Sequence, residues 1–192
     1  MNIEYEATFV DINKNTARTR LKKARAKLIR PEFLQKRFVY HLPQGHEIKG
    51  GWARIRDEGD KITMSLKIIN GNKIDDQKEI NLRIDNMEKA REFLKTLGCR
   101  EKAYQETKRE IWRLAGVEIT IDEWPFLEPF VEIEGDSKKS VEQASKKLNF
   151  DYQKAKFCAI GQLYREKYNI TLDLIDNRTP KLIFDMKNPF VK

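Results

Sequence analysis

The feature that most constrains the fold of this chain is the alternation of apolar and polar residues along short segments. In the first of these, "NIEYEATF" (residues 2–9), Ile3, Tyr5 and Phe9 share one parity, and Glu4 and Glu6 share the other. Successive side chains of a β-strand point to opposite faces, so this pattern predicts a strand with one apolar face and one charged face. Similar alternation predicts strands over residues 2–10, 34–41, 52–57, 61–69, 76–84, 103–113, 116–123 and 129–134.

Four stretches break the alternation and are predicted to be helical, namely residues 13–28, 85–98, 136–150 and 151–168. The second of them begins with Asp and ends with Gly, as a capped helix does. The tail, residues 171–192, contains "TLDLI" and "KLIFDM", which suit either short edge strands or an ordered arm. Mostly antiparallel strands with few inserted helices indicate an α+β fold, in which the strands form a barrel or a strongly curved sheet.

Composition narrows the choice of ligand and compartment. The 192 residues include 38 Lys and Arg against 30 Asp and Glu, a net charge of +8, which favours polyanions such as nucleotides, polyphosphates or nucleic acid. Cys99 and Cys158 lie far apart with no CxxC spacing, so neither a zinc site nor a disulfide scaffold is indicated. Because the sequence shows no early apolar segment and no run of 18 apolar residues, we expect a cytoplasmic protein with no membrane association.

The polar faces of the predicted strands are sorted by the sign of their charge. An ordinary sheet with one solvated face would give much the same alternation, but such a face usually mixes signs along each strand. Paired arginines suit bidentate binding of phosphate, and paired carboxylates suit a hard divalent cation, which tends to bridge phosphates. A site for a metal-bound polyphosphate and a plain solvated face therefore both remain open. The basic positions are Arg54, Arg56 and Lys67, and the acidic positions are Glu4, Glu6, Glu118, Asp122, Glu132 and Glu134.

Seven segments, taken in order, resemble the CYTH superfamily, which is named after class IV adenylate cyclase and thiamine triphosphatase. Its members are also called triphosphate tunnel metalloenzymes. The resemblance covers residues 2 to about 135, and the helices predicted after that point are compatible with it. The segments are "IEYEATF", "LQKRFVYHLP", "WARIRDEG", "MSLKI", "QKEINL", "ETKRE" and "ITIDEWPFLEPFVEIEG".

The resemblance implies an eight-stranded antiparallel β-barrel, the triphosphate tunnel, with flanking helices and a lumen lined by charge. Residues 1–170 would form the tunnel domain with its C-terminal helices, and residues 171–192 would be the tail of the same domain. Basic residues would hold a triphosphate, and carboxylates would hold Mg²⁺ or Mn²⁺. The expected partner is thus a small triphosphate molecule rather than nucleic acid, and the protein is expected to be a monomer or a homodimer.

The resemblance also implies roles for individual residues, each carried over by its position in a matching segment. Glu4 and Glu6 match the acids of the family's ExExK signature and, with Glu132 and Glu134, would bind the metal. The proposed general base or additional ligand is Glu79 or Asp122. The phosphate-binding residues matched in this way are Arg54, Arg56, Lys67 and Arg109, with Lys108 as a neighbour of Arg109 that could take a similar role. Lys36 is expected to bind phosphate with them, although the family pattern does not assign it.

One position departs from the signature, because its lysine falls at Thr8, which has no positive charge. Either Lys36 or Arg37 on the adjacent strand compensates, or the phosphate is held differently, or catalysis is weak.

Three functions follow. The first is metal-dependent hydrolysis of a triphosphate such as thiamine triphosphate, tripolyphosphate or a nucleoside triphosphate, and it is preferred because the sequence shows no recognisable adenine pocket. The second is a class IV cyclase that converts ATP to cyclic AMP and pyrophosphate. The third is a non-catalytic polyphosphate- or RNA-binding module, in which the basic stretch 14–30 and the segment "KKSVEQASKK" (residues 138–147) would supply the binding surface.

Overall fold

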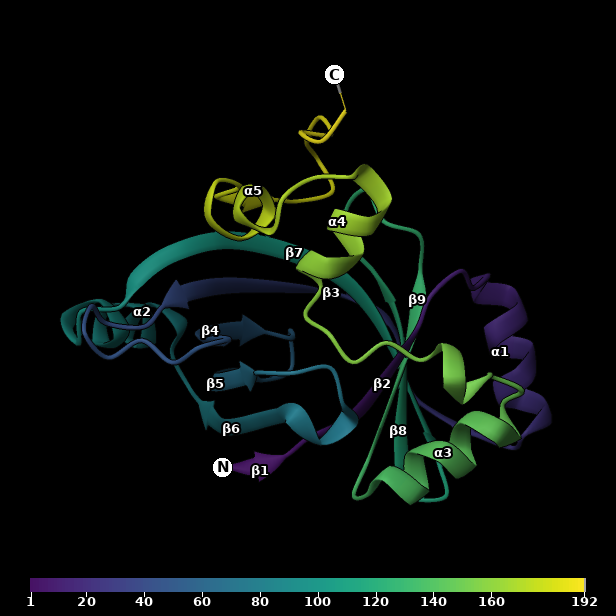
Figure 1. Ribbon diagram of the computed structural model, residues 1–192. Coiled ribbons are helices and arrows are strands. Elements are labelled where there is room, and N and C mark those ends of the chain that lie inside the picture. The colour runs from purple at the N-terminus through teal and green to yellow at the C-terminus, as the bar shows by residue number, and fades with distance from the viewer. Residues whose placement is uncertain (192) are drawn as a thin grey trace.

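A computed structural model describes residues 1–191 and contains one large antiparallel sheet that closes into a barrel (Figure 1). Its strands, in chain order, are β1 (Asn2–Ile3), β2 (Tyr5–Phe9), β3 (Lys27–His41), β4 (Gly51–Asp57), β5 (Ile62–Ile69), β6 (Gln77–Ile84), β7 (Arg100–Leu114), β8 (Val117–Glu123) and β9 (Phe130–Gly135). They follow one another around the sheet in the order β1, β6, β5, β4, β3, β7, β8, β9 and β2.

The ring closes through the first segment of the chain. β1 pairs with β6 and β2 pairs with β9, and Glu4 lies between the two short strands. When β1 and β2 are counted as one interrupted strand, eight strands form the ring within residues 1–191. The predicted eight-stranded antiparallel barrel with flanking helices is therefore confirmed.

Helices and short segments complete the chain. They are α1 (Lys14–Lys23), the 3₁₀ turn η1 (Ile74–Asp76), α2 (Met87–Thr96), α3 (Lys138–Lys147), the 3₁₀ turn η2 (Tyr152–Lys154), α4 (Gly161–Tyr168), α5 (Leu172–Asn177) and the short strand β10 (Lys181–Leu182). β10 pairs with β7 in parallel. Among residues 1–191, no helix has both the length and the apolar character needed to span a bilayer.

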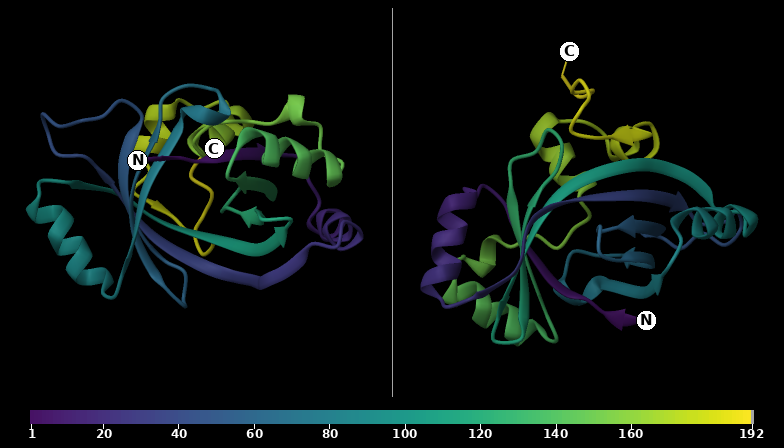
Figure 2. Two further views of the ribbon diagram at one scale, coloured as in Figure 1. Left: turned by 90° about the horizontal axis from the view of Figure 1, so that it is seen from below. Right: turned by 180° about the vertical axis from the view of Figure 1, so that it is seen from behind.

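Apolar clusters between the helices and the outer surface of the barrel hold the fold together. The largest is formed by α1 and α3, which pack on the apolar rows of β2, β7, β8 and β9. A second lies between α2 and the strands β3 and β4, and a third joins α4, α5 and β10 to Trp124 and Phe130. Figures 1 and 2 show α1 with α3, α2, and α4 with α5 as three separate groups around the ring. Because the apolar rows face these helices, the polar rows must face the barrel interior.

Two predicted helices are shorter than expected. α1 ends at Lys23 rather than near residue 28, because Arg25 takes a left-handed conformation (φ 62°) that ends the helix. The chain then pairs with β7 from Lys27 onward, so β3 begins seven residues before the predicted start at residue 34.

The predicted helix 151–168 is interrupted, because only η2 and α4 are helical in it. The residues between them are not helical, and among them Lys156 pairs with Thr8 across an antiparallel bridge. The predicted tail forms α5 and then β10, so its first half is helical rather than an edge strand. The last residue of that tail, 192, lies outside the described residues.

Candidate active site

The charged rows predicted from the sequence face the interior of the barrel. On β4, Ala53 and Ile55 are buried against α2, so Arg54 and Arg56 project to the opposite face. On β2, Ala7 and Phe9 lie in the cluster with α1 and α3, which places Glu6 and Thr8 inside. The interpretation of the alternation as a plain solvated face is therefore wrong for these strands.

Cationic side chains from three strands, β4, β5 and β7, form ion pairs inside the barrel. Lys67 Nζ on β5 lies 2.7 Å from Glu4 Oε2 and 3.6 Å from Glu6 Oε1. Arg54 Nη2 on β4 lies 3.3 Å from Glu79 Oε1 on β6. The remaining pairs are formed by Arg56 and by Arg109, with partners described below.

Arg109 on β7 is fixed by two acids, Asp122 on the neighbouring strand β8 and Glu132 on the next strand, β9. Its Nε donates to Asp122 Oδ1 at 2.7 Å, and its Nη2 donates to Asp122 Oδ2 at 3.0 Å and to Glu132 Oε2 at 2.7 Å. Asp122, whose side chain is only 1% exposed, also accepts a hydrogen bond from Thr120 Oγ1 at 2.6 Å. Arg109 and Asp122 are opposite one another in the β7–β8 register, which explains this bidentate geometry.

The structure places Arg37, and not Lys36, inside the barrel. Arg37 is buried and its Nη2 donates to Gln35 Oε1 at 3.1 Å, while its guanidinium lies 4.6 Å from the centre of the Trp124 ring. Lys36 alternates with these residues and is exposed on the outer face. The prediction of Lys36 as a phosphate-binding residue is thus wrong. The side chain of Lys108 also lies on the outer face of the barrel, because its ammonium group lies over the ring of Phe184 and near Glu123.

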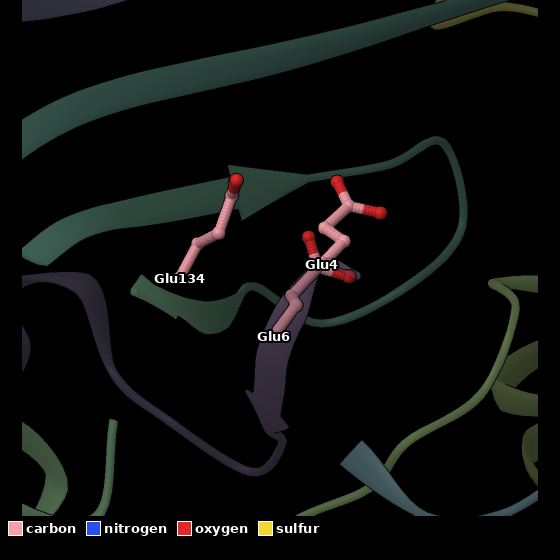
Figure 3. Close-up of side chains that lie close together, drawn as sticks. All are labelled: Glu4, Glu6 and Glu134. Atoms are coloured by element: carbon pink, nitrogen blue, oxygen red, sulfur yellow. The ribbon is translucent and has the colours of Figure 1, made fainter. Parts of the chain in front are cut away.

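Three of the four predicted metal ligands come together. Glu4, Glu6 and Glu134 each place a carboxylate oxygen within 4.8 Å of the others. Figure 3 shows the three side chains reaching toward one another from β9 and from the interrupted β1–β2 strand. Glu6 and Glu134 are register partners, which brings two like charges onto adjacent strands. Glu132 lies outside this group because Arg109 holds its carboxylate, and its role as a metal ligand stays a prediction.

The two predicted catalytic acids, Glu79 and Asp122, differ in how strongly arginine side chains hold their carboxylates. Glu79 accepts long hydrogen bonds of 3.3 and 3.5 Å from Arg54 Nη2. Asp122, in contrast, already binds Arg109 through both of its oxygens. Their assignment as general base or additional ligand stays a prediction.

Like charges crowd the cationic part of the interior. Burial, followed by the charges of Arg54, Arg56 and Arg109, places the pKa of Arg37 well below its usual range. Burial, followed by the charges of Arg54 and Arg109, lowers the pKa of Arg56 to about 10. An anion bound beside Arg37 and Arg56 would therefore stabilise the charged form of both guanidinium groups.

Three arginine nitrogen atoms in this region lack a partner. Within residues 1–191, the buried Nε atoms of Arg37, Arg54 and Arg56 make no hydrogen bond. Buried donors are normally paired, so donors left free beside one another point to a missing acceptor. A phosphate group has the charge and the oxygen atoms to supply it.

The acidic part of the interior shows the opposite imbalance. Partial desolvation and the charges of Glu6 and Glu4 raise the pKa of Glu134 to about 7. Burial opposes the charge of Lys67, but the carboxylates of Glu6 and Glu4 outweigh this and raise its pKa. One lysine thus faces three carboxylates, and an all-oxygen set of this kind fits a hard divalent cation such as Mg²⁺ or Mn²⁺.

Some residues of the site were not predicted to have a role. Gln35 and Thr107 are fully buried and hydrogen-bond to one another beside Arg37. Glu58, with a side chain 3% exposed, lies 2.9 Å from Arg56 Nη2. Thr107 has the same parity as Arg109 on β7, so its inward orientation could have been predicted from the sequence. Glu58 follows the end of β4 in a turn, where alternation does not indicate the orientation of a side chain.

Comparison with known proteins agrees with this geometry. The profile of the CYTH domain matches residues 2–167. A protein of Methanocaldococcus jannaschii named "Putative adenylate cyclase" is 30% identical over 136 residues, which cover 69% of this chain and 76% of that protein.

Solved structures share the fold. A conserved hypothetical protein from Pyrococcus furiosus matches with a TM-score of 0.69 at 23% identity, covering 83% of this chain and 99% of that one. A protein of Vibrio parahaemolyticus described as a "putative adenylate cyclase" matches with a TM-score of 0.72 at 13% identity, covering 85% and 98%. A Hippeastrum protein matches with a TM-score of 0.56 at 14% identity, covering 92% and 100%. The chain belongs to the CYTH family, whose members are triphosphatases or class IV adenylate cyclases.

Proposed function

We propose that this protein is a metal-dependent hydrolase of a triphosphate-containing substrate bound inside the barrel. The observation that carries the proposal is the set of buried guanidinium groups of Arg37, Arg54 and Arg56, whose Nε atoms have no acceptor in the described part of the chain, residues 1–191. They lie in the same interior as the carboxylates of Glu4, Glu6 and Glu134.

The cationic residues would first overcome the charge that protects a triphosphate from attack. Arg37, Arg54 and Arg56 would neutralise phosphate oxygens and hold the chain in line for displacement. Arg109 would contribute a guanidinium that Asp122 and Glu132 already hold in place, so little reorganisation is needed during reaction.

Glu4, Glu6 and Glu134 would hold the cation. A bound Mg²⁺ or Mn²⁺ would polarise phosphate oxygens as a Lewis acid and neutralise part of their charge. Glu79, which is held only weakly by Arg54, would accept a proton from the attacking water. Asp122 would position Arg109 rather than exchange protons, because its oxygens already accept three hydrogen bonds.

Cyclisation of ATP is the second candidate, and the name of the Methanocaldococcus jannaschii relative favours it. Hydrolysis is preferred because the Hippeastrum protein, although named an adenylyl cyclase, is described as having a dominant triphosphatase activity. Both reactions would use the same phosphate-binding residues.

The test is a product assay on the purified protein with ATP, thiamine triphosphate and inorganic tripolyphosphate, each with Mg²⁺ or Mn²⁺. We expect phosphate release that chelation abolishes and that Arg56→Gln reduces by at least a hundredfold. Arg113→Gln, which removes a side chain that is 57% exposed, is the matched control and should leave the rate unchanged. Cyclic AMP with pyrophosphate as the main products would establish the cyclase instead. No turnover of any of the three would overturn both activities.

A further inference from the structure

The surroundings of Thr8 contain a lysine that the sequence pattern does not reveal. On one side of Thr8, β9 places Glu132 directly opposite. On the other side, the extended segment before α4 places Lys156 directly opposite. The backbone N–H of Thr8 donates to the Lys156 carbonyl at 3.0 Å, and the N–H of Lys156 donates to the Thr8 carbonyl at 2.9 Å.

This pairing fixes the face to which Lys156 projects. Directly opposed residues of an antiparallel pair send their side chains to the same face. Thr8 faces the barrel interior, so Lys156 leaves the backbone toward that interior as well. Cys158 lies two residues further on. Burial raises the pKa of its thiol to about 11, the charge of Lys156 opposes this shift, and the carboxylates of Glu166, Glu132 and Glu6 add to it.

Among residues 1–191, the ammonium group of Lys156 is held by one replaceable partner, Glu166. Its Nζ lies 2.6 Å from Glu166 Oε2 on α4, and the two side chains are 29% and 43% exposed. Ion pairs at this exposure contribute little to stability. A triphosphate carries several negative charges and would compete effectively for the ammonium.

The distance is also suitable. Hydrogen-bonded partners in an antiparallel pair have Cα atoms about 5.5 Å apart, which the flexible four-carbon stem of lysine can span. Lys156 can therefore bring its ammonium to the region that a lysine at position 8 would serve.

We propose that Lys156 is a phosphate-binding residue that supplies, from the neighbouring segment, the positive charge missing at Thr8. In the unliganded protein Glu166 holds the ammonium outside the phosphate site, and substrate binding transfers it to a phosphate oxygen. This inference rests on the proposed function, because it needs a triphosphate in the barrel.

The test is calorimetric titration of the full chain with inorganic tripolyphosphate in the presence of Mg²⁺, which measures binding independently of turnover. Lys156→Gln should raise the Kd about tenfold or more, and Lys156→Arg should largely retain affinity. Glu166→Gln should tighten binding, because it frees the ammonium. The matched control is Lys154→Gln, which removes an equal charge from an exposed position on the same segment and should change little.

The decisive variant is the double substitution Thr8→Lys with Lys156→Gln. It moves the charge to the opposed position on β2 and should restore most of the affinity lost in Lys156→Gln. If Lys156→Gln binds tripolyphosphate like the wild type, the inference is wrong while the proposed function stands. The same conclusion follows if Lys156→Gln loses affinity but neither the added Thr8→Lys substitution nor Lys156→Arg retains it. If the wild type does not bind tripolyphosphate, the proposed function fails and this inference falls with it. Thermal unfolding checks each fold, and if Lys156→Gln unfolds, Lys156→Arg and Glu166→Gln decide the outcome.

Discussion

Arg37 shows at the scale of single residues what the barrel interior is suited to bind. A buried guanidinium close to other arginines is unfavourable for the unliganded fold, since burial and like charges both oppose its positive charge. The positive charge of such a group is stabilised when an anion binds beside it. We therefore expect the charge of Arg37 to lower the stability of the unliganded fold and to strengthen the binding of an anion.

Replacing Arg37 tests that coupling. Arg37→Met should raise the free energy of unfolding of the unliganded protein by about 1 kcal/mol, because it removes a buried charge and leaves Gln35 paired with Thr107. The same change should weaken tripolyphosphate binding by about tenfold or more. Denaturant unfolding and calorimetry measure the two effects. A variant that is both less stable and unimpaired in binding would contradict this account of Arg37.

Glu134 gives a prediction for the dependence of stability on pH in the absence of divalent cations. Its pKa of about 7 in the fold exceeds the ordinary value of 4.5, so the folded state binds the proton more tightly than the unfolded state. The contribution of this proton to stability is present below pH 4.5 and is lost as the pH rises through 7. Relative to Glu134→Gln, the wild type with chelator should lose stability over that range, by about 1 kcal/mol or less given the exposure of the side chain.

Thermal unfolding at pH 5 and pH 8 measures this difference. Glu88→Gln, at a carboxylate that is 75% exposed on α2, is the control and should show no such trend. Equal pH dependence of the wild type and Glu134→Gln would show that the three carboxylates do not interact as described.

Residue orientation could be predicted on most strands but not on β3. The row of Leu34, Lys36 and Phe38 and the row of Gln35, Arg37 and Val39 each mix apolar and polar residues. Neither row identifies the interior, because the outer face of β3 is exposed near Lys36 and covered by apolar contacts near Phe38. Register with β4, which puts Arg37 opposite Arg56, resolves the ambiguity only in three dimensions.

At the scale of elements, the basic helix α1 is partly a structural feature. Arg18 donates to the buried carboxylate of Glu110 on β7 at 2.8 and 3.0 Å, and Lys14 forms ion pairs with Glu32 and Glu123. These two cations are thus used to dock α1 on the barrel. They are not available as part of a surface for nucleic acid, which weakens that alternative for the first half of the helix.

Removal of Arg18 tests this docking role. Arg18→Ala leaves the buried carboxylate of Glu110 with one side-chain donor among residues 1–191, Trp112 Nε1 at 2.6 Å. The free energy of unfolding should fall by about 2 kcal/mol, while the affinity for tripolyphosphate stays the same. Denaturant unfolding and calorimetry measure the two quantities, and Lys22→Ala on the exposed side of α1 is the control. Equal stability of Arg18→Ala and the control would contradict the docking role.

The same scale shows why sequence patterns misplaced some element boundaries. Residues 24–33 have helix-forming composition in part, but the left-handed turn at Arg25 and the pairing of β3 with β7 decide their conformation. Residues 155–160 were predicted as helix, yet they supply hydrogen bonds to the free edge of β2 at Thr8. Both outcomes depend on long-range strand pairing, which local periodicity does not report.

At the scale of the whole molecule, the barrel brings together two regions of opposite charge imbalance. The region around Arg37, Arg54 and Arg56 holds buried guanidinium Nε atoms with no acceptor among residues 1–191. The region around Glu4, Glu6 and Glu134 has three carboxylates facing one lysine, Lys67. The proposed metal-bound triphosphate would balance both regions at once. The closed ring of strands makes this possible, because it brings β2 and β9 from one part of the ring and β4 from another to a shared interior.

Ligand addition should therefore stabilise the fold more than either component does alone. Mg²⁺ with tripolyphosphate should raise the melting temperature by more than the sum of the separate shifts. Each ligand neutralises charge in the shared interior and therefore favours binding of the other. Differential scanning calorimetry in chelator, Mg²⁺, tripolyphosphate and both together measures the effect. Purely additive shifts would indicate two independent sites.

The most direct test of the shared interior is a titration of Mn²⁺ followed by electron paramagnetic resonance, with and without tripolyphosphate. We expect tripolyphosphate to tighten Mn²⁺ binding to the wild type by at least tenfold. Glu6→Gln should weaken Mn²⁺ binding itself, and Arg54→Gln with Arg56→Gln should remove the effect of tripolyphosphate while leaving Mn²⁺ binding intact. Mn²⁺ affinity that is unchanged by tripolyphosphate in the wild type, or by Glu6→Gln, would contradict the account.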